Sequence, residues 1–90
     1  MFTPVFTKQF KKDYKLSQKG GLNMEDLDSV IEKLIDGRKL EYKYKDHALI
    51  GEFKDCRECH INNDWLLLYQ YDFTDNTIAL IRTGSHSDLF

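Results

Sequence analysis

The hydrophobic period of this chain changes near residue 43, and this change restricts the fold more than any other feature. Before it, apolar residues recur every three to four positions, as on one face of a helix, and the clearest run is Leu27, Val30, Ile31, Leu34 and Ile35. After it, apolar and polar residues alternate with the period of two that is typical of strands. Helices followed by strands favour an α+β fold, so we expect two helices packed on one face of a small antiparallel sheet.

Capping residues indicate the bounds of the two expected helices, about 7–19 and 24–37. Gly20 and Gly21 end the first helix. Asn23 is a suitable N-cap for the second, and Gly37 fits the position just after its end, where a left-handed backbone is common.

The sheet is expected mainly over residues 48–82. Alternating patterns predict strands over 49–53 and 56–61, and the apolar run 65–71 predicts a strand buried on both faces. A last strand follows over 77–82, after turns at 62–64 and 72–76, and the segment 2–6 is a further strand candidate.

Length and composition limit the class of protein. Ninety residues allow one domain, over 1–90, with one modest core, and a hydrophobic share of 41% favours a folded chain. No apolar run reaches the roughly 20 residues of a membrane span, and no export signal is recognisable, so we expect a cytoplasmic protein without a membrane partner. The net charge of −2 argues against coating nucleic acid by charge alone, although residues 1–45 hold ten Lys and Arg against seven Asp and Glu.

The segment CRECH, residues 56–60, has the spelling of a c-type haem attachment site. Successive side chains of a strand point to opposite faces, so Cys56 and Cys59 point apart, whereas haem or zinc needs both sulfurs on one side. We therefore expect no metal and no cofactor, with Cys59 in the core and Cys56 partly exposed. His60 would share its strand face with Cys56 and Glu58.

Side chains suited to acid–base chemistry gather at the ends of the expected elements. All three histidines of the chain, His47, His60 and His86, stand at such boundaries, and Asp64 and Arg82 stand at strand ends. A lone histidine is most often a surface residue. Five such groups at the edge of a rigid sheet indicate a functional site.

Several motifs in a fixed order make this chain similar to the YafQ-like branch of the RelE/ParE toxins. They are KDH-x-L-x-G at 45–51, R-E-x-H at 57–60, D-W at 64–65, R-T-G-S-H at 82–86 and L-F at 89–90. The resemblance extends over the whole chain and implies the same fold of two helices on an antiparallel sheet. It also implies a bacterial toxin that cleaves mRNA on the translating ribosome, with a cognate antitoxin as partner. We expect a monomer for the free toxin and a heterotetramer for the complex with the antitoxin.

The functional residues that the resemblance implies are His47, His60, Asp64, Arg82, His86 and Phe90, with Lys45 as a further RNA-binding residue. RNA cleavage without a metal needs a base for the 2′-hydroxyl proton, an acid for the leaving 5′-oxygen and a cation for the phosphorane. We expect His86 to be the acid, and His60 with Asp64, or His47, to be the base and its orienting group. Arg82 would hold the scissile phosphate.

Other interpretations remain for parts of this assignment. Phe90 would stack on an RNA base, or would instead be a C-terminal plug on the sheet. A lysine stripe on the first helix is either a solvated face or a contact with ribosomal RNA: Lys8, Lys12, Lys15 and Lys19. Two alternative functions are gyrase inhibition, as in ParE-type relatives, and a binding module without catalysis. The histidines together with Asp64 disfavour the first of these.

Overall fold

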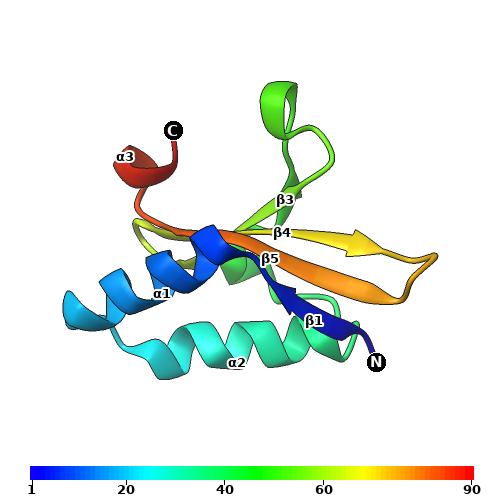
Figure 1. The fold of residues 1–90 in the computed structure, drawn as a ribbon, viewed down its shortest axis with the longest axis horizontal. Coiled ribbons are helices and arrows are strands. Elements are labelled where there is room, and N and C mark those ends of the chain that lie inside the picture. Colours follow the sequence, from blue (N-terminus) through cyan, green and yellow to red (C-terminus); the bar gives the residue numbers. More distant parts are fainter.

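The structure, a computed structural model that describes residues 1–90, consists of helices on both faces of one five-stranded sheet (Figure 1). Its elements are β1 (Thr3–Phe6), α1 (Lys8–Lys19), α2 (Met24–Ile35), β2 (His47–Ala48), β3 (Arg57–Asn62), β4 (Trp65–Asp72), β5 (Thr77–Gly84) and α3 (His86–Leu89). The strand order is β1-β5-β4-β3-β2. The long helices α1 and α2 cover one face, as predicted, and the short α3 lies on the other face.

The predicted capping residues flank α2, and Thr7, which was not predicted as a cap, starts α1. Asn23 Oδ1 accepts a hydrogen bond from the backbone N–H of Glu25, and Thr7 Oγ1 does the same for Phe10 at the start of α1. Gly37 has a φ of 72°, and its N–H donates to the Leu34 carbonyl, which is the C-terminal motif that the sequence indicates. The helix α2 ends at Ile35, slightly before the predicted bound, because the next residue is its C-cap.

The sheet is mostly antiparallel, as predicted, with one parallel pair. The strand β1 pairs with β5 in parallel, with Thr3 beside Thr77 and Phe6 beside Leu80, while all other strand pairs are antiparallel. The two strands can run in parallel because the whole of the chain between them, including α1 and α2, forms the crossover.

The predicted strand at 49–53 is wrong. Only His47–Ala48 pair with β3, and Gly51–Phe53 form a 3₁₀ helix. The φ of +75° at Gly51 turns the backbone out of the sheet. Leu49 and Phe53 both pack on one small apolar cluster, so their alternation marks a shared face rather than a strand.

The central strand β4 separates two apolar layers. Leu67 and Tyr69 belong to the main core on the side of α1 and α2, and Leu66 and Leu68 pack with Leu89 of α3 on the opposite side. All residues from Trp65 to Tyr69 are buried, which confirms the predicted burial on both faces. None of the helices has the length and apolar content that crossing a membrane requires.

Candidate active site

The three histidines lie in a row on the sheet face that is opposite α1 and α2. The ring centroids of His47 and His60 are 6.5 Å apart, and those of His60 and His86 are 6.0 Å apart. Their face follows from the strand register, because His60 pairs with Leu66, whose side chain packs toward α3. The structure thus brings together residues that come from β2, β3 and the start of α3.

A buried carboxylate, Glu58, stands between two of these rings. Its Oε1 lies 3.5 Å from Nε2 of His47 and 3.5 Å from Nε2 of His60, and the residue is only 4% exposed. Because an ionised carboxylate only accepts hydrogen bonds, Glu58 can orient an imidazole that carries a proton on Nε2. The alternation over 56–61 predicts Glu58 on the face of His60, but Glu58 is not among the predicted site residues. Its alternation with His60 was the available signal.

The main chain of Lys45 holds the outer histidine. His47 Nδ1 lies 2.7 Å from the Lys45 carbonyl oxygen, and since a carbonyl can only accept, this nitrogen carries the proton. Lys45 has a left-handed backbone with φ of 49°, which directs its carbonyl toward the ring. Its side chain, predicted to bind RNA, is exposed beside the row of histidines.

Asp64 orients His86 and not His60, which corrects the predicted pairing. Its Oδ1 accepts a hydrogen bond from the His86 backbone N–H at 3.2 Å and lies 3.1 Å from His86 Nδ1. The backbone donor, followed by the ring, lowers the pKa of Asp64. Asp64 pairs with His86 because the turn after β3 places Asp64 beside the start of α3. With Nδ1 engaged, Nε2 of His86 is the nitrogen that can exchange a proton with a substrate.

A β-bulge in β5 decides which way Arg82 points. Leu68 pairs with Arg82 and Tyr69 pairs with Leu80, so Ile81 is the extra residue. Without it, Arg82 would stand opposite Leu67 and face the helices. With it, Arg82 stands in the same register row as Leu68 and Glu58, on the face of the histidines. Its guanidinium then reaches round the edge of β5 to Asp13 of α1, with Nε and Nη2 each 3.0 Å from a carboxylate oxygen.

Leu89 and Phe90, at the end of the described chain, point to different surroundings. The ring of Phe90 continues the row, with its centroid 6.2 Å from that of His86, and the residue is 58% exposed. Leu89 is buried against Leu66 and Leu68. The plug on the sheet that we considered for Phe90 is therefore formed by Leu89.

Trp65 and the two cysteines have structural surroundings. Trp65 is buried, as predicted, and its Nε1 donates to Thr83 Oγ1 at 2.9 Å. Cys59 lies in the main core and Cys56 is partly exposed, again as predicted, and burial raises the pKa of both thiols. No three His, Cys, Asp or Glu side chains are arranged as ligands of a metal ion.

This fold and site define a class of protein, the toxins of type II toxin–antitoxin systems. Residues 2–90 match the family model described as "Bacterial toxin of type II toxin-antitoxin system, YafQ". The chain therefore belongs to the YafQ family, which confirms the resemblance seen in its sequence.

Named relatives agree with this membership. The mRNA interferase toxin YafQ of Escherichia coli K12 is 38% identical over 86 residues, covering 94% of this chain and 91% of the relative. A metal-bound toxin from Helicobacter pylori has a TM-score of 0.94 at 46% identity, with both chains fully covered. The YafQ chain of the E. coli DinJ–YafQ complex has a TM-score of 0.91 at 35% identity, covering 100% of this chain and 99% of the other.

Proposed function

We propose that this toxin is an endoribonuclease that cleaves mRNA by attack of a 2′-hydroxyl, with histidines as acid and base. The observation that supports this most is the row of His47, His60 and His86. Glu58 lies beside His60, and Asp64 lies beside His86. A relative that is 38% identical carries the name mRNA interferase toxin.

The separation of the rings suits an in-line displacement. The attacking and leaving oxygens stand on opposite sides of the phosphorus, so the base and the acid must stand apart with the phosphate between them. His60 and His86, whose ring centroids are 6.0 Å apart, would take these two positions. His60 would take the 2′-hydroxyl proton as the 2′-oxygen bonds to phosphorus, and His86 would give a proton from Nε2 to the 5′-oxygen as the P–O bond breaks. The products are a cyclic phosphate and a 5′-hydroxyl.

The remaining groups would bind and stabilise the substrate. Glu58 would orient His60. His47, which donates from Nδ1 to the Lys45 carbonyl, would be the other base that the sequence allows and would accept the proton at Nε2. Arg82 would stabilise the charge of the phosphorane with the N–H donors that Asp13 leaves free. Phe90, exposed at the end of the row, would stack on a neighbouring base, and Lys45 would contact the RNA backbone.

The partners follow from the same proposal. The E. coli complex of YafQ with DinJ supports a cognate antitoxin for this chain. We further propose a monomeric free toxin, a heterotetramer with the antitoxin, and action on the translating ribosome in the bacterial cytoplasm.

The test is induced expression of the wild type and of His86→Ala, with primer extension on a reporter mRNA. We expect growth arrest with new in-frame breaks from the wild type. The variant should cleave about 10²- to 10⁴-fold more slowly, as expected when one acid–base group is lost. Because the His86 side chain is 57% exposed, its melting temperature should match that of the wild type.

Two other outcomes would refute the proposal. Arrest with intact mRNA would favour gyrase inhibition, which a supercoiling assay then measures directly. No arrest, together with no RNA cleavage by the purified protein, would favour a binding module without catalysis.

A further inference from the structure

The strongest unassigned feature is a buried carboxylate on α1 that the mechanism above does not use. Asp13 occupies a sheet-facing position between Phe10 and Ser17 and is only 6% exposed. A buried carboxylate is costly unless it is paired and hydrogen-bonded, and an apolar residue at such a position is often at least as stable. Packing alone therefore does not explain a carboxylate at position 13.

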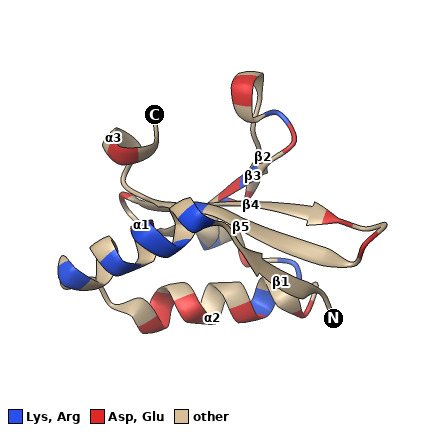
Figure 2. Cartoon of the chain, viewed as in Figure 1, with Lys and Arg blue, Asp and Glu red and all other residues tan.

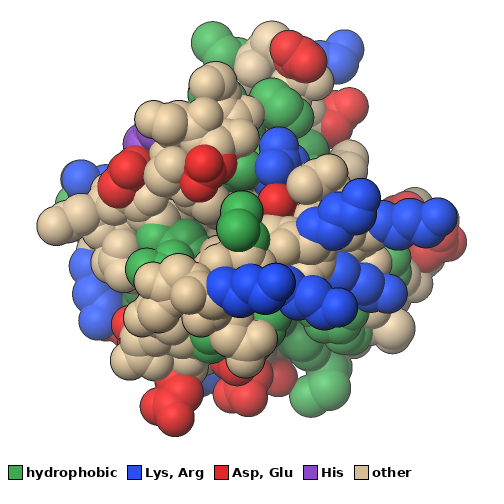
Figure 3. Space-filling model, turned by 60° about the vertical axis from the view of Figure 1, so that its left-hand side comes forward, with side chains coloured by type: hydrophobic (Ala, Val, Ile, Leu, Met, Phe, Trp, Pro, Cys, Tyr) green, Lys and Arg blue, Asp and Glu red, His purple; other side chains and the backbone are tan.

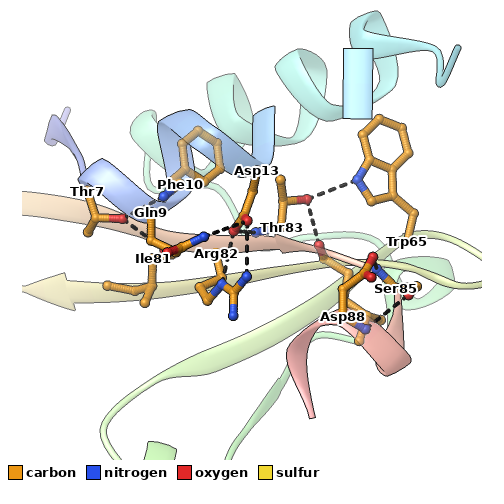
Figure 4. A network of polar contacts seen from close by, with 11 residues as sticks. Thr7, Gln9, Phe10, Asp13, Trp65, Ile81, Arg82, Thr83, Ser85 and Asp88 are labelled. Atoms are coloured by element: carbon orange, nitrogen blue, oxygen red, sulfur yellow. Dashed lines mark hydrogen bonds and ion pairs between the residues drawn. The ribbon is translucent and has the colours of Figure 1, made fainter. Parts of the chain in front are cut away.

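Four hydrogen bonds converge on this carboxylate. Arg82 donates twice, from Nε and Nη2, at 3.0 Å each, and the backbone N–H of Thr83 donates at 3.2 Å. Gln9 Nε2 donates the fourth at 3.1 Å. Figure 4 shows Asp13 reaching from α1 to the edge of β5, with these donors around it.

The edge of β5 is open to this contact because β1 ends beside Leu80. The residues that follow in β5 have no strand on that side, and α1 replaces it. Thr7 Oγ1 donates to the carbonyl of the bulge residue Ile81 at 2.9 Å, and Asp13 accepts the N–H of Thr83. Both contacts fix the bulge that turns Arg82 toward the histidines.

The pair also fixes which donors of Arg82 remain for a ligand. A guanidinium has five N–H donors in a planar fork, and Asp13 engages the edge formed by Nε and Nη2. Arg82 lines a cavity of about 580 Å³, whose wall also includes Asp64, Ser85 and Asp88. Asp64 is the residue that orients His86, so Arg82 and the carboxylate beside the proposed acid line the same cavity.

We infer that Asp13 is a positioning residue for the proposed ribonuclease, holding Arg82 in the one orientation that presents its free donors to the scissile phosphate. The inference rests on the proposed function. The Asp13 carboxylate accepts hydrogen bonds from Arg82, Thr83 and Gln9. It acts only through Arg82, which separates this role from simple stabilisation of the fold.

The test is a kinetic double-mutant cycle with a model RNA, using Asp13→Asn, Arg82→Ala and the double variant. We expect Asp13→Asn to lower kcat by about 100-fold with little change in KM, as a misplaced group far from the chemistry can do. In the Arg82→Ala background the same change should have no further effect, because there is no guanidinium left to position. Asp13→Glu, which keeps the charge, should recover part of kcat.

Matched controls separate positioning from stability. Asp28→Asn removes an exposed α2 carboxylate that bonds only to the Tyr14 hydroxyl, and it should leave kcat unchanged. A wild-type kcat for Asp13→Asn would overturn the inference while the proposed function stands. An equal loss with and without Arg82 would also overturn it. If the wild type cleaves no RNA, the proposed function fails and the inference fails with it.

Discussion

At the scale of single residues, Asp13 and Glu58 are both buried carboxylates, but they have different partners. Their exposed fractions are 6% and 4%. Asp13 is paired with a guanidinium and two further donors, whereas Glu58 has two imidazoles at 3.5 Å. Burial alone would raise the pKa of Asp13, but the hydrogen bonds from Arg82, Gln9 and Thr83 outweigh it and hold that pKa below its usual value.

That lowered pKa predicts how stability depends on pH. As the pH falls, the unfolded chain binds a proton at this carboxyl first, so the contribution of Asp13 is present above about pH 4 and is lost at lower pH. Asp13→Asn should lower the free energy of unfolding by about 1–3 kcal/mol at pH 7, since donors of Arg82 and Thr83 lose a partner. Urea unfolding at pH 7 and pH 3 measures both effects.

The expected result is a smaller difference between the two pH values for Asp13→Asn than for the wild type. Asp64 and other carboxylates still titrate in this variant, so some pH dependence should remain. An unchanged difference would mean that Asp13 is not stabilised in its charged form.

At the scale of elements, the sequence predicts most residues of the candidate site. It does not predict which face Arg82 lies on or which histidine Asp64 contacts. Alternation along β3 predicted the buried Cys59 and the shared face of Glu58 and His60, because a strand has a fixed period of two. The bulge at Ile81 adds one residue to β5 and changes the face of Arg82, and no local signal in 77–84 marks it. The pairing of Asp64 with His86 depends on the α3 helix, which the sequence did not predict because it has only four residues.

The short helix α3 predicts opposite effects for its last two residues. Leu89→Ala should lower the free energy of unfolding by about 2 kcal/mol, since Leu89 fills the cluster of Leu66 and Leu68. Phe90→Ala should change it by less than about 0.5 kcal/mol, because Phe90 is 58% exposed, and should instead slow RNA cleavage. Thermal unfolding and primer extension on both variants give the comparison. Loss of stability in Phe90→Ala with wild-type cleavage would reverse the assignment.

At the scale of the whole molecule, charge is distributed unevenly over an acidic protein. The net charge is −2, yet α1 carries a stripe of exposed lysines, while acidic side chains gather on α2 (Figure 2). Lysine and arginine side chains form a band across the surface in the view of Figure 3. The stripe itself consists of Lys8, Lys12, Lys15 and Lys19, all exposed.

This distribution predicts that binding to ribosomes depends on salt through α1. Replacing the four stripe lysines by glutamine should reduce the slope of log affinity against log salt by up to about 3, since each phosphate contact contributes ~0.7 on single strands. Glutamine at Lys39, Lys43 and Lys54, which are exposed elsewhere, is the control and should change the slope less for each lysine replaced. An identical slope for the stripe variant and the wild type would make α1 a solvated face only.

The parallel pairing of β1 with β5 has a consequence for synthesis. Thr3–Phe6 are synthesised well before their partners, Thr77–Leu80, so β1 cannot enter the sheet until β5 has been made. The contacts of Thr7 with Ile81 and of Asp13 with Arg82 are delayed in the same way, because they also join the two ends of the sequence. Long-range contacts of this kind form late in folding. A nascent chain of this protein therefore cannot assemble the proposed catalytic face until β5 has emerged from the ribosome that makes it.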